Sequence, residues 1–190
     1  MAALGLDEVW WLVSPGNPLK RRESMASLSA RYRSALRQAR RAPIRVTAIE
    51  RELGTRYTID TLRALQARYR KREFLWLMGS DNLLQFHKWK AWRDIARTMP
   101  IAVIARPGYD ASAAASPATA WLRGHTVSPA AYRRGDGSVP TLIKLHFDPD
   151  PRSATAIRRT HPDWADSMGS GPLFDQVTHR RIFASAETAA

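Results

Sequence analysis

Small hydroxyl residues and an arginine occur together in the segment "SATAIR", residues 153–158. Hydroxyl residues at a helix start place side-chain donors beside free backbone N–H groups, and the helix dipole adds partial positive charge there. Arg158 follows about one turn later and can offer a forked guanidinium to the same anion. Ser153, Thr155 and Arg158 are therefore candidate phosphate ligands, although a plain capped helix with a solvated arginine also explains this segment.

A second group of candidates lies in "FLWLMGSDNLLQFHKWKAW", residues 74–92. Gly79 follows an apolar run and lets a ligand approach the backbone closely. Asp81 can accept hydrogen bonds from a ribose, or it can cap the helix that follows. Trp89 can stack on a flat heterocycle, although tryptophans three residues apart, such as Trp89 and Trp92, usually belong to a core.

Three further candidates, Lys20, Thr58 and Arg106, stand in loops or at helix starts that follow predicted strands. Lys20 belongs to the proline-stiffened loop "SPGNPLK" and can meet a phosphate or a carboxylate, although most surface lysines meet only water. Ligands of open α/β sheets bind outside the carboxyl ends of the strands. We therefore expect these residues to share one rim of the sheet with Gly79 and Asp81.

The composition excludes several kinds of site. The chain has no cysteine, and therefore no disulfide, thiol nucleophile or thiolate metal site, which fits a reducing cytoplasm. Its five histidines show no metal-ligand spacing, and it contains neither a G-x-S-x-G elbow nor a P-loop, so we predict no metal site. No apolar run approaches the roughly 18–20 residues of a membrane span, so we predict no membrane segment and a cytoplasmic location.

The chain of 190 residues carries a net charge of +13, from 30 Lys and Arg against 17 Asp and Glu. Such an excess implies anionic partners, whether nucleotides, phosphates or nucleic acid, but an arginine-rich solvated surface also accounts for it. No RNP, KH, helix-turn-helix or zinc-finger pattern occurs. We therefore expect no nucleic-acid partner and keep a basic nucleic-acid-binding module as an alternative function.

Apolar runs alternate with segments of helical periodicity, which predicts an α/β fold with a parallel sheet and right-handed crossovers. We expect one domain over residues 1–160 and a tail over residues 161–190. Because residues 9–13 are consecutively apolar, the first strand is expected to be buried on both faces. The expected strands are residues 8–14, 42–50, 74–78, 101–105 and 141–147.

Helices are expected between these strands. Ser24 is expected to cap a helix whose apolar face includes Leu28 and Tyr32. Thr58 is expected to cap a second helix, with Asp60 in its first turn. Further helical segments are expected at residues 83–97, at 111–120 as a loop or short helix, after residue 150, and in the tail at 173–184.

Five segments together resemble the bacterial nicotinate-nucleotide adenylyltransferases, which are Rossmann-like nucleotidyltransferases of the H-x-G-H type. The segments are "GLDEVWWLVSPGNPLK", "TRYTIDTLRAL", "FLWLMGSDNLLQFHKWKAWRDI", "IAVIARPG" and "SATAIR", within residues 4–160. The resemblance implies a doubly wound parallel sheet. It also implies adenylyl transfer from ATP to nicotinate mononucleotide in NAD biosynthesis, giving nicotinate adenine dinucleotide and pyrophosphate, with Mg²⁺ accompanying ATP.

The resemblance assigns an ATP-binding role to one set of residues. The family's S-S-T-x-I-R signature falls on residues 153–158, with alanine in place of the second serine. Gly79 and Asp81 match the family's G-x-D, which contacts a nucleotide ribose. The ATP-binding residues implied are Gly79, Asp81, Arg106, Ser153, Thr155 and Arg158.

A second set is implied to bind the mononucleotide. Trp89 would stack on the nicotinate ring, and backbone N–H groups near Thr58 and Lys90 would meet its carboxylate. Lys20 falls in the loop that closes over the substrate.

The chain departs from the family at one motif. Family members begin with a strand and a G-G-[ST]-F-[DN]-P-x-H-x-G-H segment, and nothing in this chain matches them. The resemblance therefore implies a truncated sheet without its first strand and phosphate loop, and it assigns no catalytic residue. A start site assigned too late is the explanation that we favour, and an inactive truncated paralogue is the alternative. We expect little activity from these 190 residues, activity from an upstream-extended form, and a homo-oligomer formed through exposed strand edges.

Overall fold

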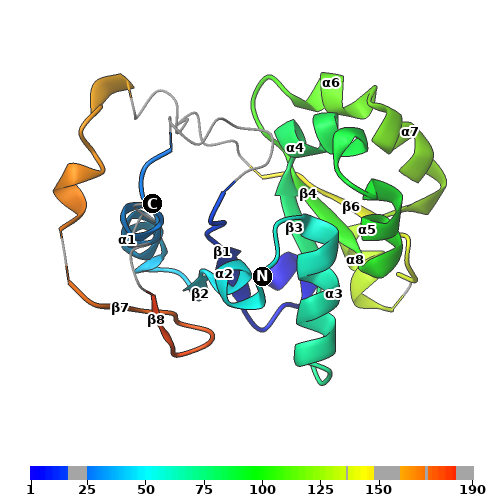
Figure 1. Cartoon of the computed structure of the whole chain (residues 1–190). Helices are drawn as coiled ribbons and strands as arrows, with labels where there is room; N and C mark the ends of the chain where they lie inside the picture. The colour runs from blue at the N-terminus through cyan, green and yellow to red at the C-terminus, as the bar shows by residue number, and fades with distance from the viewer. Residues whose placement is uncertain (17–24, 136, 148–158, 170, 183–190) are drawn as a thin grey trace. The chain divides into compact units, whose positions relative to one another are not determined.

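The computed structural model describes residues 1–16, 25–135, 137–147, 159–169 and 171–182 (Figure 1). The chain divides into two compact units, which are described separately below. The first unit consists of Met1, Leu6–Arg56 and the described residues from 159 onward, and the second of Ala2–Gly5 with residues 57–147.

A parallel sheet of four strands forms the centre of the second unit, in the order β3-β4-β6-β5. Gly79 pairs with Ile104, and Ile104 with Leu145, so three strands end at the same level. The run "IAVI" forms a strand because β4 has a neighbour on each side and is largely buried. The expected α/β fold with a parallel sheet is confirmed. The strands are β3 (Trp76–Gly79), β4 (Ile101–Ile104), β5 (Thr126–Val127) and β6 (Leu142–Leu145).

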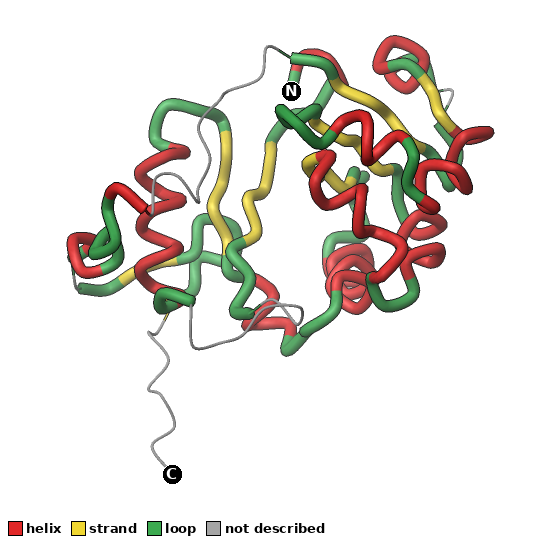
Figure 2. The backbone as a smooth tube through the Cα atoms, turned by 90° about the horizontal axis from the view of Figure 1, so that it is seen from above, coloured by secondary structure: helices red, strands yellow, loops and turns green. Residues whose placement is uncertain are grey.

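Helices flank this sheet (Figure 2). In α3, Ile59, Leu62 and Leu65 recur at helical spacing and are all buried. The helices of this unit are α3 (Thr58–Arg68), α4 (Ser80–Gln85), α5 (Trp92–Thr98), α6 (Asp110–Ala114), α7 (Pro117–Leu122) and α8 (Pro129–Arg133), with the 3-10 turns η1 (Ala2–Leu4), η3 (Phe86–Lys88) and η4 (Arg123–His125).

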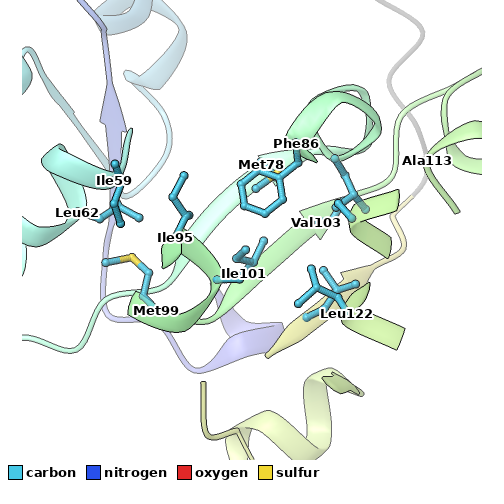
Figure 3. Packing of buried hydrophobic residues seen from close by; sticks show 14 residues of the cluster. Ile59, Leu62, Met78, Phe86, Ile95, Met99, Ile101, Val103, Ala113 and Leu122 are labelled. Carbon is cyan, nitrogen blue, oxygen red and sulfur yellow. The ribbon is translucent and has the colours of Figure 1, made fainter. Parts of the chain in front are cut away.

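The core of the second unit gathers apolar side chains of the sheet and of the helices (Figure 3). Ile101 of β4, Phe86 of η3 and Ile95 of α5 are completely buried in one cluster. Trp89 and Trp92 are partly buried and pack against the same cluster. The core thus holds the segment between β3 and β4, which carries several candidate site residues.

The first unit contains a parallel pair of strands and an antiparallel hairpin. Tyr32 of α1 and Val46 of β2 are completely buried, in a cluster that also contains Ile182 of the hairpin. The C-terminal segment therefore shares a core with residues 28–48. The elements are β1 (Val9–Leu12), α1 (Leu28–Ala39), β2 (Ile44–Thr47), α2 (Ile49–Leu53), η5 (Asp166–Met168), β7 (Leu173–Phe174) and β8 (Arg181–Ile182).

Asp175, between β7 and β8, attaches the hairpin to the end of β2. Its side chain is buried and accepts hydrogen bonds from the Thr47 hydroxyl at 3.0 Å and the Ala48 N–H at 2.7 Å. The N–H groups of Val177 and Thr178 also donate to it, both at 2.9 Å. Four donors therefore compensate the burial of this carboxylate.

Tyr32 makes a second attachment between the hairpin and β2. Its hydroxyl donates to the Val46 carbonyl at 2.7 Å and accepts from the Gln176 N–H at 3.1 Å. Burial of this hydroxyl raises the pKa of Tyr32 well above its ordinary value.

The first strand is shorter and more exposed than expected. It spans Val9–Leu12 instead of residues 8–14, and Trp11 is 41% exposed, so the expectation of burial on both faces is wrong. In the described ranges β1 pairs only with β2 and is therefore an edge strand, without the cover on both faces that central strands of parallel sheets receive.

Two helix starts also differ from expectation. Ser27 caps α1, since its Oγ accepts from the Ala30 N–H at 3.2 Å, whereas Ser24 lies outside the described residues. Thr58 is the first residue of α3 and not its cap, because Tyr57 has the extended backbone of an N-cap. Asp60 does lie in the first turn of α3, as expected.

Residues 83–97 do not form the single expected helix. α4 ends at Gln85, η3 follows, and Ala91 takes a left-handed backbone conformation with a φ of 49° before α5 begins. The break lets Trp89 and Trp92 both pack edge-to-face on Phe86, with ring centroids 5.5 and 5.8 Å away. Core packing therefore overrides the helical periodicity.

The tail segment expected as a helix is the hairpin β7–β8 in its described part, because Asp175 binds the N–H groups of the turn. α6 and α7 fill the region expected as a loop or short helix, whereas α2, β5 and α8 were not expected. The segment after residue 150, where a helix was expected, lies largely outside the described residues. The domain boundary at residue 160 stays a prediction.

Candidate functional site

Asp81 and Arg106 form an ion pair at the carboxyl ends of two neighbouring strands. Asp81 lies in the first turn of α4, directly after β3, and Arg106 lies two residues after β4. An Arg106 Nη1 atom stands 3.2 Å from Asp81 Oδ2. The Arg106 side chain is exposed, whereas that of Asp81 is about three-quarters buried. The strand ends thus bring together two of the candidates, as expected for an α/β rim.

Ser80 joins the same two strand ends through the backbone. Its buried hydroxyl accepts a hydrogen bond of 2.9 Å from the N–H of Arg106. Sequence reasoning missed Ser80, although its place inside the G-S-D turn was a usable signal. The hydroxyl fixes where the loop after β4 starts relative to Asp81.

Gly79 makes room for this arrangement. A Cβ atom at Gly79 would collide with Asp81 Oδ1 and lie 3.1 Å from Arg106 Nε. Asp81 Oδ1 is itself buried and has no hydrogen-bond partner in the structure. A buried carboxylate oxygen without a donor is costly, so this turn is suited to accept a hydroxyl or N–H of a ligand.

A second group of candidates gathers around Lys90. Its Nζ atom lies 3.3 Å from Asp60 Oδ2 and 4.3 Å from the centroid of the Tyr57 ring. Tyr57 and Asp60 stand on either side of Thr58 at the start of α3, so the structure places Lys90 next to the Thr58 segment. Sequence reasoning did not assign Tyr57 or Asp60 to this site.

Trp89 precedes Lys90 and is partly buried against the core. One edge-to-face contact with Phe86 holds its indole ring. Its Nε1 is buried and has no hydrogen-bond partner in the structure. The ring is therefore fixed in direction, which suits a stacking surface but also fits a core tryptophan.

Four candidates lie outside the described residues: Lys20, Ser153, Thr155 and Arg158. On either side of the Lys20 segment, Arg31 donates to the Ser14 carbonyl at 2.6 Å and the Ala26 carbonyl at 3.0 Å. Arg31 therefore connects Ser14 and Ala26, which lie on either side of this segment.

In the part of the chain that the structure describes, no three His, Asp or Glu side chains gather as a metal site would require. Each helix found in these same ranges is too short or too polar to span a bilayer.

Comparison with known proteins shows the family to which the chain belongs. A family model described as cytidylyltransferase-like matches residues 1–160. A probable nicotinate-nucleotide adenylyltransferase from Erythrobacter litoralis is 71% identical over 191 residues, which cover 100% of this chain and 87% of that relative. The chain belongs to the cytidylyltransferase-like family, among the nicotinate-nucleotide adenylyltransferases. The resemblance seen in the five segments is thereby confirmed.

Other members of this adenylyltransferase family are also similar. The probable nicotinate-nucleotide adenylyltransferase of Parvibaculum lavamentivorans is 49% identical over 159 residues, or 83% of this chain and 79% of the relative. That of Agrobacterium fabrum is 42% identical over 164 residues, or 83% of this chain and 85% of the relative.

Proposed function

We propose that the chain transfers the adenylyl group of ATP to nicotinate mononucleotide, in the synthesis of NAD. The phosphate of the mononucleotide attacks the α-phosphorus of ATP, and the bond from that phosphorus to the bridging oxygen of pyrophosphate breaks. The products are nicotinate adenine dinucleotide and pyrophosphate. Such transfers depend on alignment and on stabilisation of charge.

One observation supports the ATP site most directly. Asp81 keeps one carboxylate oxygen buried and without a partner, on a turn where Gly79 leaves room for a ligand. A ribose hydroxyl donating to this oxygen would compensate its burial. Arg106 is paired with the other carboxylate oxygen and its side chain is exposed, and a guanidinium is well suited to bind a phosphate.

The remaining roles follow from the family. Ser153, Thr155 and Arg158 would hold the ATP phosphates, Trp89 would stack on the nicotinate ring, and Lys20 would close over the substrate. Backbone N–H groups near Thr58 and Lys90 would meet the ring carboxylate.

Mg²⁺ would arrive with ATP, where it neutralises part of the phosphate charge. Mg²⁺ in nucleotide sites is usually bound by the phosphates and one or two carboxylates. We assign no metal ligand and no catalytic residue to the chain itself.

The test follows pyrophosphate release from ATP and nicotinate mononucleotide. It uses the 190-residue chain and, beside it, the protein translated from the furthest upstream in-frame start. Release that requires both substrates in either form supports the proposal. Transfer to other acceptors but not to nicotinate mononucleotide contradicts it.

Asp81→Asn tests the ATP site, and Asp94→Asn is the matched control at an exposed ion pair with Arg97. We expect Asp81→Asn to raise the ATP concentration needed for half-maximal rate by about tenfold, because a hydrogen bond to a charged group contributes about 1.5–3 kcal/mol. Equal effects of the two variants would contradict the assignment.

Three further expectations complete the proposal: a cytoplasmic location, self-association into a homo-oligomer, and no nucleic-acid partner. A titration with a random oligonucleotide at two salt concentrations tests the last, because a nucleic-acid binder loses affinity steeply with salt.

A further inference from the structure

Three consecutive residues of the turn after β3 each contact a different part of Arg106. The Ser80 hydroxyl accepts the Arg106 N–H at 2.9 Å, and Asp81 Oδ2 lies 3.2 Å from Nη1. A Cβ atom at Gly79 would lie 3.1 Å from Arg106 Nε and 3.2 Å from Cδ, so the middle of the side chain passes over the glycine. The turn therefore guides Arg106 from its backbone to its guanidinium.

The hydrogen bond to Ser80 extends the sheet beyond the end of β3. The Ala105 N–H donates to the Leu145 carbonyl of β6 at 3.1 Å. Successive N–H groups of a strand point to opposite sides, so the Arg106 N–H points toward β3. β3 ends at Gly79, and Ser80 is already the first residue of α4. The Ser80 hydroxyl thus accepts in place of a strand carbonyl.

This bond is less accessible to water than the ion pair on the same turn. Ser80 is only 3% exposed, whereas the side chain of Arg106 is 60% exposed. An exposed ion pair holds a long side chain weakly, because ordering that side chain costs entropy. Without the hydroxyl, the Arg106 N–H would lose its acceptor and the loop after β4 would shift to find another. The backbone bond therefore decides where the arginine side chain starts.

We propose that Ser80 is a positioning residue of the ATP site. Its hydroxyl holds the backbone of Arg106 in the place from which the guanidinium can bind a nucleotide phosphate. Ser80 acts through Arg106 and needs no contact of its own with ATP. This inference rests on the proposed function, since it concerns the affinity of the chain for ATP.

A purely structural serine would behave differently, and Ser116 provides the comparison. It is also 3% exposed and lies in the same unit, where its hydroxyl accepts the Thr119 N–H at 3.2 Å and caps α7. Ser80→Ala and Ser116→Ala therefore each remove a buried acceptor from a backbone N–H. Both should lower the free energy of unfolding, but only Ser80→Ala should weaken ATP binding.

The experiment measures the dissociation constant of ATP by titration calorimetry, which requires no turnover. We expect Ser80→Ala to raise this constant about fivefold, within the range of coupling between members of one hydrogen-bond network. Ser116→Ala should change it by less than about twofold, because separate sites act almost independently.

A second substitution shows whether Ser80 acts through the guanidinium. Arg106→Met keeps the backbone N–H and its bond to Ser80 but removes the group that meets the phosphate. In the Arg106→Met background, Ser80→Ala should therefore change the ATP dissociation constant by less than about twofold. A general loss of folding would instead weaken binding in both backgrounds alike.

Ser80→Cys keeps the approximate size of the side chain, and its thiol accepts only weakly, so it should raise the constant in the same direction. It carries both comparisons if Ser80→Ala does not fold. A folded Ser80 variant that binds ATP as tightly as the native chain overturns the inference. So does an equal effect with and without the Arg106 side chain, or an equal effect of Ser116→Ala. A native chain that does not bind ATP overturns the site itself, while pyrophosphate release in the transfer assay reports separately on the proposed function.

Discussion

Arg106 Nη1 lies 3.2 Å from Asp81 Oδ2, although 25 positions separate the two residues in the chain. Parallel pairing of β3 with β4 produces this proximity, because Gly79 and Ile104 stand opposite each other at the strand ends. The Ser80 hydroxyl and the Arg106 N–H fix the two turns further. The strand-end site is therefore a consequence of strand register, and its glycine should tolerate no side chain.

Gly79→Ala should weaken ATP binding. The added Cβ collides with Asp81 Oδ1 and crowds Arg106 Nε, so the carboxylate must turn away from the ligand. We expect the dissociation constant of ATP to rise about tenfold, as for the loss of one hydrogen bond to a charged group. Titration calorimetry measures it. Gly124→Ala is the control, because no atom lies within 4 Å of its added Cβ, and equal affinities in the two variants would refute the crowding argument.

The stability of the first unit should fall at alkaline pH. Burial raises the pKa of Tyr32, so the folded chain retains a proton that the unfolded chain releases. The resulting stabilisation is complete below about pH 10, the ordinary tyrosine pKa, and is lost as the pH rises toward the higher folded-state pKa. Unfolding in urea between pH 8 and 11 should show the decline, and Tyr32→Phe should flatten it.

Tyr32→Phe should also cost about 1–3 kcal/mol at neutral pH, since the Val46 carbonyl and the Gln176 N–H lose their partner. Tyr109→Phe removes a hydroxyl from an exposed ring and should leave the unfolding free energy unchanged. If the free energy of unfolding fell more steeply at alkaline pH in Tyr32→Phe than in the native chain, deprotonation of Tyr32 would not account for the loss of stability.

Asp175→Asn should destabilise the first unit almost as much as Asp175→Ala. Four donors face the carboxylate, and an amide presents its own N–H₂ group to some of them. We expect a loss of about 2–3 kcal/mol in urea unfolding. The exposed Asp166→Asn provides the comparison and should change stability by less than about 0.5 kcal/mol. A fully stable Asp175→Asn would mean that shape, and not charge, holds the hairpin.

Ala91→Gly should stabilise the second unit. A left-handed alanine costs about 1–2 kcal/mol, of which the greater freedom of unfolded glycine cancels about half. The midpoint of thermal unfolding should therefore rise slightly. Ala64→Gly, within α3, should lower it through a loss of about 1 kcal/mol. If both variants lowered the midpoint equally, the left-handed conformation would carry no strain.

Much of the architecture was predictable because it depends on neighbouring residues. The apolar run of β4 is typical of a buried strand, and the helical spacing of Ile59, Leu62 and Leu65 is typical of the buried face of a helix. The G-S-D turn after β3 and the post-strand position of Arg106 followed from the same pattern. Alternation of such segments was enough to predict an α/β fold whose candidate residues follow the strands.

Tertiary packing decided the features that local sequence patterns did not predict. Residues 83–97 have helical periodicity, yet the chain breaks near Ala91 because two tryptophans reach one phenylalanine. The segment at 173–182 forms a hairpin because Asp175 finds donors at the end of β2, more than 120 residues earlier. Lys90 meets Asp60 by the same kind of long-range approach. Sequence patterns record which side chains are buried, whereas the partner of a charged or hydrogen-bonding group depends on which distant segment the core brings beside it.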